Sequence, residues 1–340
     1  MLHTSRRYTL EPSPERFVLQ RSVGTTAELS PKQVLIRVAA ASLNYRDWLV
    51  LHGVRDNRAG LVPLSDAAGT VVAVGSDVSR WQSGDRVSPS FFSAWHDGAF
   101  RPHHLASALG GGQTEGVLAE YIVADESAVV AVPEHLSLAE AATLPCAGVT
   151  AWHALFERGQ LQAGETVLVQ GTGGVAMLAL QLATAHGAKV IVTSSSDDKL
   201  DRAKALGAWQ TINYRRDENW DQAALALTDG QGVDHILELG GPQTYARSLN
   251  AVAHGGRIAQ IGVLTGFDAA PHITPMQFKN ASIHGICVGS VAHYARLNQF
   301  ITQHQIKPRI DREFSFEDAP AAYQTLADAG HVGKLVIQLN

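Results

Sequence analysis

The sequence predicts an α/β protein with two parts, a doubly wound parallel sheet of six strands and a β-rich, partly closed barrel. From about Ala147 onward, short apolar strands alternate with helical segments, which is typical of a parallel sheet with crossover helices. The residues before Ala147 instead form closely spaced β-branched runs separated by glycine and proline, which favours a small barrel. A length of 340 residues is sufficient for two such domains.

The barrel part begins with strands that we expect at residues 34–38 and 69–75, and a turn at residues 84–87 leads into a third. Near the end of the chain, a helix at residues 319–329 and a strand at 334–339 are expected to return to this part. The predicted β-rich substrate domain therefore comprises residues 1–146 and 293–340.

The sheet part, residues 147–292, has six expected strands. They are residues 166–170, 189–193, 210–213, 234–239, 257–261 and 282–288. Between the first two strands, Val175, Leu178 and Leu182 recur at helical spacing. Between the second and third, Ser196 can cap a helix that Gly207 ends. This alternation predicts a Rossmann-type sheet.

A glycine loop joins the first expected strand to the first helix and reads Gly171-Thr172-Gly173-Gly174-Val175-Ala176, which matches G-x-G-x-x-A. Gly171 permits a tight turn, Gly173 lets the backbone approach a pyrophosphate, and Ala176 lets helix and strand pack closely. The helix N-terminus supplies free N–H groups to the phosphate. The loop therefore predicts a dinucleotide site that includes Gly174 and Val175.

The end of the second strand indicates which dinucleotide is bound. An NAD site usually places Asp or Glu there, whereas this chain has Ser194 and Ser195, followed by Lys199. Hydroxyl groups and an ammonium suit a 2′-phosphate, and Tyr214 and Arg215 after the third strand can close over that phosphate or over the adenine. The alternative is that Ser196 only caps a helix and that Lys199 is a solvated charge. We expect NADP(H).

Five separated motifs resemble those of the medium-chain dehydrogenase/reductases, and most closely the zinc-independent quinone oxidoreductase branch. They lie at residues 41–47, 68–71, 84–87, 171–176 and 333–334, so the resemblance covers essentially the whole chain. It implies a GroES-like barrel domain beside the Rossmann domain.

The zinc alcohol dehydrogenases of this family hold a catalytic zinc with a Cys, a His-Glu pair and a second Cys. The matching positions here are Asn44, the pair Ser65-Asp66, and Cys146, of which Cys146 alone keeps the ligand type. Catalytic zinc needs about three protein ligands. The chain has 2 cysteines in all, which also excludes a four-cysteine zinc lobe. We therefore expect no metal.

The resemblance makes Asn44, Tyr45 and Asp47 the candidate catalytic residues, because they lie where the metal site would be. Asn44 and Tyr45 would donate to a substrate oxygen, and Asp47 would orient them or pass on a proton. Alternatively, Tyr45 is a core aromatic residue, and Asp47 caps a helix or pairs with Arg46 or Arg86. Cys146 is expected to be a small buried residue.

The resemblance also implies contacts with the nicotinamide half of the cofactor. Thr150 and Val175 would pack against its ring. Gly262, Val263, Gly289 and Ser290 follow the fifth and sixth strands at their carboxyl ends, where ligands bind in such sheets. Lys334 would reach the same region from the tail. The further positions expected to touch the cofactor are therefore Thr150, Gly262, Val263, Gly289, Ser290 and Lys334.

Composition limits the partners. The net charge is −5, which gives no electrostatic reason to expect nucleic acid or a membrane surface. Two cysteines and a basic N-terminus without an apolar run favour a cytoplasmic protein.

The sixth strand is a candidate sheet edge, and relatives commonly pair there, so a homodimer is expected. The segment with His96, His103 and His104 is interpreted as a lid or a solvated loop.

Together these features predict a zinc-free NADPH-dependent reductase that delivers hydride to quinones or α,β-unsaturated carbonyl compounds. Such substrates carry their own electron sink, which a metal-free site requires. Two alternatives stay open: a metal-free alcohol dehydrogenase, and an NADPH-binding sensor or structural protein with little turnover.

Overall fold

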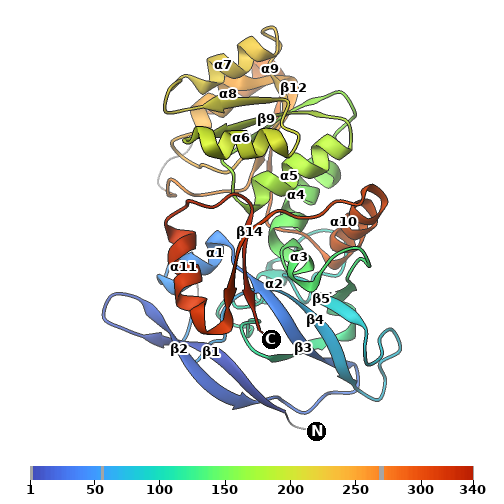
Figure 1. The fold of residues 1–340 in the computed structure, drawn as a ribbon. Helices are drawn as coiled ribbons and strands as arrows, with labels where there is room; N and C mark the ends of the chain where they lie inside the picture. The colour runs from blue at the N-terminus through green and yellow to red at the C-terminus, as the bar shows by residue number, and fades with distance from the viewer. Residues whose placement is uncertain (1–2, 55–56, 268–271, 340) are drawn as a thin grey trace. The chain divides into compact units, whose positions relative to one another are not determined.

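The computed structural model describes residues 3–54, 57–267 and 272–339 (Figure 1). The chain forms two compact units, Met1–Val149 with Gly289–Asn340, and Thr150–Val288. The boundaries expected from the sequence, 146/147 and 292/293, lie a few residues from these positions. Each unit is described below by itself.

The second unit contains the six-stranded sheet, in the order β10-β9-β8-β11-β12-β13. Every neighbouring pair in it is parallel, which confirms the doubly wound prediction. The strands are β8 (Thr166–Gln170), β9 (Lys189–Ser194), β10 (Gln210–Asn213), β11 (Val233–Glu238), β12 (Val252–Gln260) and β13 (Ser282–Gly285).

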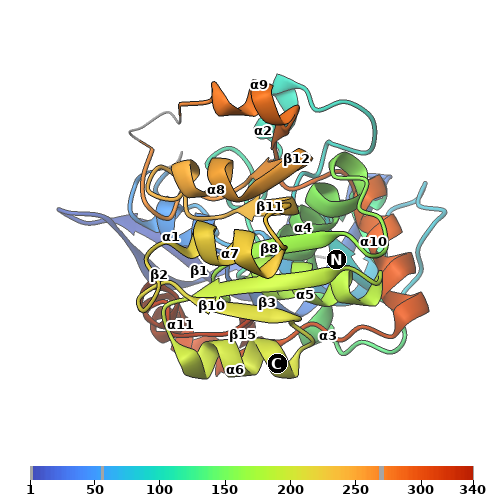
Figure 2. The same cartoon turned by 90° about the horizontal axis from the view of Figure 1, so that it is seen from above.

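Helices cover this sheet because its central strands are apolar on both sides. Val167, Leu168 and Val169 of β8 are fully buried, as expected for a strand inside a parallel sheet. Helices α5 (Gly174–Ala185) and α6 (Asp197–Ala205) pack on β8, β9 and β10. Helix α7 (Trp220–Leu227) packs on β10, and α8 (Tyr245–Ala251) and α9 (Pro275–Lys279) pack on the β11–β12 side (Figure 2).

Two of these strands differ from the expected ranges. Strand β12 begins at Val252, five residues earlier than predicted, because the glycines at 255 and 256 lie within it rather than forming a turn. The β11–β12 pairing shifts register there, as in a bulge. Strand β13 ends at Gly285, before the expected residue 288, and Val288 has a φ of 52°, which is outside the strand region.

The first unit contains a seven-stranded sheet and a separate hairpin. The sheet runs β14-β15-β3-β4-β5-β7, and β6 also pairs with β3. The strands of this unit are β1 (Thr4–Pro12), β2 (Phe17–Thr25), β3 (Gln33–Ser42), β4 (Asp66–Val74), β5 (Arg86–Pro89), β6 (Tyr121–Asp125), β7 (Val129–Ala131), β14 (Ile310–Ser315) and β15 (Lys334–Gln338). The tail joins this unit, since β15 pairs antiparallel with β3.

Short helices and two longer ones complete the chain. They are α1 (Tyr45–Leu51), α2 (Pro102–Leu105), α3 (Leu138–Ala141), α4 (Val149–Trp152), α10 (Val291–His304) and α11 (Ala319–Ala327). Turns of 3₁₀-helix lie at Glu126–Ala128 and Phe316–Asp318, and π-helical turns at Leu144–Gly148 and His153–Arg158. Within the described ranges, no helix is both long enough and apolar enough to cross a membrane.

Candidate active site

The glycine loop has the geometry that a dinucleotide phosphate requires. Gly171 follows β8 with a φ of 77°, a conformation that side chains rarely adopt. A Cβ added to Gly173 would meet nothing within 4 Å, so open space lies beside the backbone. Gly173 is the N-cap of α5 and has no side chain to cap the helix, so the first N–H groups stay available for an anion. The residues present therefore fit a pyrophosphate.

The residues expected to surround a 2′-phosphate meet at the end of β9. The side chain of Ser194 is almost fully buried, and its Oγ accepts a hydrogen bond from the N–H of Ser196 at 3.4 Å. The N–H of Tyr214 donates to the carbonyl of Ser194 at 3.0 Å. Ser195 and Lys199 are half-buried on the following segment. The backbones of Ser194 and Tyr214 thus lie side by side.

A carboxylate next to this position is already paired. Asp197, in the first turn of α6, accepts a hydrogen bond from Asn213 Nδ2 at 2.8 Å and forms an ion pair with Arg216. Its charge is therefore compensated, and Arg216 brings a cation to this corner that sequence reasoning overlooked. Ser196 occupies the N-cap position of α6, as expected, but its side chain makes no cap hydrogen bond.

A buried carboxylate organises the carboxyl end of β11, and sequence reasoning missed it. Glu238 is fully buried, and Oε1 accepts the N–H groups of Gly240 and Gly241 at 3.0 and 2.9 Å. Oε2 accepts Gln170 Nε2 at 2.9 Å, and Gln170 Oε1 accepts the N–H groups of residues 239 and 240. These bonds fix the loop after β11. The glycine pair after an apolar strand was the available signal.

The remaining expected cofactor positions in this unit lie at strand and helix ends. The N–H of Gly262, after β12, donates to the carbonyl of Glu238 at 3.0 Å. A Cβ on Gly262 would lie 2.0 Å from the carbonyl oxygen of Leu239, so the close backbone approach requires glycine. Val263 follows it, Val175 lies half-buried in the first turn of α5, and Thr150 is buried in α4.

Gly289 and Ser290 belong to the first unit, where they begin α10. Ser290 is fully buried, and its Oγ accepts the N–H of His293 at 3.1 Å. The Ser290 hydroxyl therefore caps the helix. A Cβ on Gly289 would lie 2.7 Å from Val149 Cγ1, so this glycine permits close packing.

In the first unit, α1 carries the candidate catalytic residues. Asn44 is the N-cap, and its N–H donates to Asp47 Oδ2 at 2.7 Å. Arg46 donates to Asp47 Oδ1 at 3.2 Å. Burial raises the pKa of Asp47 to about 6, although Arg46 lowers it. Asp47 therefore makes the contacts of a carboxylate that caps α1 and pairs with Arg46, which is the alternative to a catalytic role that the sequence left open.

Tyr45 begins α1 and is half-buried. Its ring stacks on that of Trp48, with centroids 5.6 Å apart and planes 13° apart. Burial raises the pKa of the phenol, which keeps it protonated at neutral pH and able to donate.

A second buried carboxylate, that of Asp66, contacts two other positions that the resemblance aligns with zinc ligands, Ser65 and Cys146. Asp66 is fully buried at the start of β4, and its oxygens accept Ser65 Oγ at 2.7 Å and the N–H of Cys146 at 3.0 Å. Burial raises the pKa of Asp66, and Lys334 opposes that shift. Burial likewise holds the pKa of the Cys146 thiol well above its usual range.

Lys334 lies in this cluster, which was not expected. Its Nζ donates to the carbonyl of Leu43 at 2.6 Å and also to Asn44 Oδ1, and it lies 4.0 Å from Asp66 Oδ2. The lysine is only 3% exposed. Asn44 Nδ2 is buried and makes no hydrogen bond of normal geometry among the residues that the structure describes, although the Asn44 side chain helps to lower the pKa of Asp66.

This donor set does not fit a zinc ion. The amide oxygen of Asn44 already accepts from the Lys334 ammonium, so a metal cation at this position would lie against a positive charge. Elsewhere in the described residues, no group of three or more His, Cys, Asp or Glu side chains is arranged to hold a metal. His103 and His104 contact each other, and His104 stacks on Trp95.

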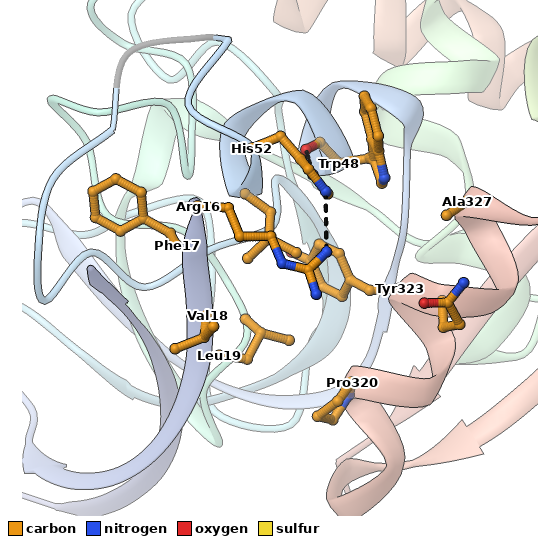
Figure 3. Close-up of a pocket in the computed structure, with 11 residues that line it drawn as sticks. Arg16, Phe17, Val18, Leu19, Trp48, His52, Pro320, Tyr323 and Ala327 are labelled. Atoms are coloured by element: carbon orange, nitrogen blue, oxygen red, sulfur yellow. Dashed lines mark hydrogen bonds between the residues drawn. The ribbon is translucent and has the colours of Figure 1, made fainter. Parts of the chain in front are cut away.

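A cavity of about 200 Å³ lies beyond the other end of α1 (Figure 3). Trp48 of α1, His52 just after this helix, Tyr323 of α11 and residues 16–19 line it, and Arg16 extends across it to His52 Nε2 at 3.2 Å. His52 Nδ1 contacts the carbonyl of Trp48 at 2.8 Å. Asn44, Tyr45 and Asp47 are not among its lining residues, so this cavity is separate from the polar cluster.

Comparison with known proteins agrees with this arrangement. A family model described as alcohol dehydrogenase GroES-like domain matches residues 30–134, and one described as zinc-binding dehydrogenase matches residues 174–303. A zinc-type alcohol dehydrogenase-like protein of Schizosaccharomyces pombe is 41% identical over 321 residues, 92% of each chain. The quinone oxidoreductase of Mus musculus is 30% identical over 337 residues, 96% of this chain and 95% of its own.

A solved structure from Sinorhizobium meliloti 1021, titled as a candidate alcohol dehydrogenase, superposes with a TM-score of 0.93. It is 44% identical and covers 99% of both chains. Members of this family bind nicotinamide dinucleotides, which suits the glycine loop between β8 and α5. The chain therefore belongs to the medium-chain dehydrogenase/reductase family and is an oxidoreductase.

Proposed function

We propose that this protein is a zinc-free, NADPH-dependent reductase of quinones or α,β-unsaturated carbonyl compounds. The observation that carries the proposal is the buried amide of Asn44, whose Nδ2 makes no hydrogen bond of normal geometry among the described residues, although the Asn44 side chain helps to lower the pKa of Asp66. It lies in a cluster whose cation is the Lys334 ammonium. A substrate oxygen placed in line with Nδ2 would satisfy this donor.

The chemistry follows from what these side chains offer. Bound NADPH supplies a hydride for an electron-poor carbon of the substrate. As negative charge develops on the substrate oxygen, Asn44 Nδ2 and the protonated Tyr45 phenol donate to it. Asp47 holds the N–H of Asn44 and therefore acts as a positioning residue. The proton that completes the product would come from Tyr45 or from water.

These donors are weaker than a Lewis acid, and this difference favours one class of substrate. Oxidising a simple alcohol requires an alkoxide to be stabilised, usually by a metal. A quinone or an enone delocalises the developing charge over its own conjugated system. Two neutral donors are therefore matched to quinones and enones better than to alcohols.

The choice of NADPH over NADH rests on the corner at the end of β9. Ser194, Lys199 and Tyr214 offer hydroxyl groups and a cation to a 2′-phosphate, at the position where an NAD site would place a carboxylate. Asp197 is close in sequence, but it forms an ion pair with Arg216 and accepts a hydrogen bond from Asn213.

We further infer a homodimer formed through β13. This strand is one of the two edge strands of the six-stranded sheet, and Ile283 on it is 39% exposed. An edge strand with an exposed apolar side chain favours pairing with a second copy.

Steady-state kinetics with NADPH and a naphthoquinone test the proposed donor. Asn44→Ala should lower kcat about 100-fold, a typical cost for losing one oxyanion donor, and leave the dissociation constant of NADPH unchanged. The matched control is Gln299→Ala, an exposed position on α10, which should retain full activity. An Asn44→Ala variant with undiminished kcat would refute the assignment.

A further inference from the structure

We propose that Lys334 is a positioning residue that fixes the orientation of the Asn44 side-chain amide. In this orientation, Asn44 Nδ2 faces the substrate and donates a hydrogen bond to its oxygen. This inference rests on the proposed function and deepens it. It assigns to Lys334 a role other than the cofactor contact that the sequence suggested.

The ammonium of Lys334 is buried, and its surroundings compensate it. A buried lysine charge is costly unless it is paired and hydrogen-bonded. Nζ donates to Leu43 O at 2.6 Å and to Asn44 Oδ1, and Asp66 Oδ2 lies 4.0 Å away. The cluster is balanced overall, because Lys334 and Arg46 face the two carboxylates of Asp47 and Asp66.

The amide of Asn44 has one acceptor end and one donor end, and Lys334 selects between them. A lysine ammonium has three donors and no acceptor. The amide oxygen must therefore face Nζ, because the flipped amide would bring two donors together. The NH₂ end then points away from Lys334, makes no hydrogen bond of normal geometry among the described residues, and belongs to a side chain that helps to lower the pKa of Asp66. The end of the amide opposite Lys334 is thus always a donor.

The backbone keeps both residues in place. Strands β15 and β3 pair antiparallel, and next to this pair Leu43 N donates to Leu335 O at 3.1 Å while Ser42 Oγ donates to the same carbonyl at 2.9 Å. Gly333 precedes the lysine with a φ of 93°, and a Cβ there would lie 2.2 Å from Arg309 O. The ammonium is therefore delivered to Asn44 by rigid elements, which suits a preorganised site.

The direction of the amide determines the substrate class. A free N–H pairs with an oxygen that accepts a hydrogen bond and gains negative charge during the reaction, such as the oxygen of a quinone or an enone. If the amide oxygen were free instead, the site would favour a substrate hydroxyl. The inference therefore favours reduction of a carbonyl-conjugated substrate.

A double-mutant cycle tests whether Lys334 acts through Asn44. Lys334→Met removes the ammonium but keeps the length of the side chain, and it should lower kcat with a naphthoquinone by about tenfold or more. Lys334→Arg should recover part of the loss. The variant that combines Asn44→Ala with Lys334→Met should be no slower than Asn44→Ala alone, within about twofold. Lys32→Met, an exposed lysine of the same unit, is the matched control.

Two outcomes would overturn the inference. Losses that multiply in the double variant would mean that Lys334 acts independently of Asn44. A Lys334→Met variant that binds NADPH more weakly, measured by nicotinamide fluorescence, would instead indicate a cofactor contact.

An NMR measurement separates this inference from the proposed function. In protein labelled with [¹⁵N]asparagine, the Asn44 side-chain signal is identified by its loss in Asn44→Ala. Lys334→Met should shift this signal and speed its exchange with water, whereas an unchanged signal would overturn the inference. A wild-type enzyme that turns over no quinone or enone would overturn the proposed function and leave this measurement valid.

Discussion

Replacing Asp47 by asparagine should change how the stability of the protein depends on pH. The carboxylate is fully buried, so burial raises its pKa from 3.8 to about 6. The asparagine side chain would keep an oxygen for the N–H of Asn44 but would carry no charge to desolvate. The Arg46 ion pair exists only while Asp47 is ionised, and its favourable effect is already included in the pKa of about 6.

The sign of the effect follows from the direction of the shift. A raised pKa means that the native state holds the proton more tightly than the unfolded state, so ionisation of Asp47 destabilises the native state above about pH 6. This penalty disappears as the pH falls toward 4. A shift of about two units corresponds to about 3 kcal/mol. Relative to wild type, Asp47→Asn should therefore gain about 2 kcal/mol or more between about pH 4 and pH 7.

Urea unfolding of both proteins across this pH range measures the difference directly. Asp85→Asn is a suitable control, because Asp85 is a partly exposed carboxylate in the turn before β5. A difference between Asp47→Asn and wild type that stays constant with pH, or that falls as the pH rises, would refute the reasoning from burial.

Three further predictions concern the cofactor, the metal and the assembly. Ser194→Asp should weaken NADPH binding roughly tenfold or more and leave NADH less affected, because a carboxylate repels the 2′-phosphate; equal weakening of both cofactors, in fluorescence titrations, would be inconsistent with the phosphate site. Elemental analysis should find no stoichiometric zinc, and EDTA should leave turnover unchanged; one zinc per chain whose removal abolishes activity would contradict the assignment of Lys334 as the cation of the site. Light scattering should give the mass of a dimer for wild type and of a monomer for Ile283→Lys, because a lysine at a sheet edge blocks pairing; a monomeric wild type would exclude the β13 interface.

The sheet of the second unit could be predicted because its signals are local. Strand β8 occupies the range expected from its apolar run, and the following loop and helix carry the glycine pattern of a phosphate site. The differences arise where tertiary pairing overrides local chemistry. The glycines at 255 and 256 indicate a turn, but pairing with β11 keeps them within β12.

The active-site cluster was only partly predictable. The resemblance identified Asn44, Asp66 and Cys146 as one site, and the structure places Asp66 against both Cys146 and Lys334. Lys334 lies 290 positions from Asn44 along the chain, and although both belong to motifs of the resemblance, nothing in the sequence indicates that their side chains touch. Only the pairing of β15 with β3 brings them together. Glu238 was missed for the opposite reason, since a single Glu at the end of an apolar strand is locally unremarkable.

Oxidation of NADPH, followed by absorbance, tests the central claim most directly. The panel contains a naphthoquinone, an enone, an alkenal and a simple ketone, each with NADPH and in parallel with NADH. The account predicts turnover of the quinone or the enone, a preference for NADPH, and no reaction with the ketone. Turnover of the ketone or of an alcohol in preference to the conjugated substrates would contradict it.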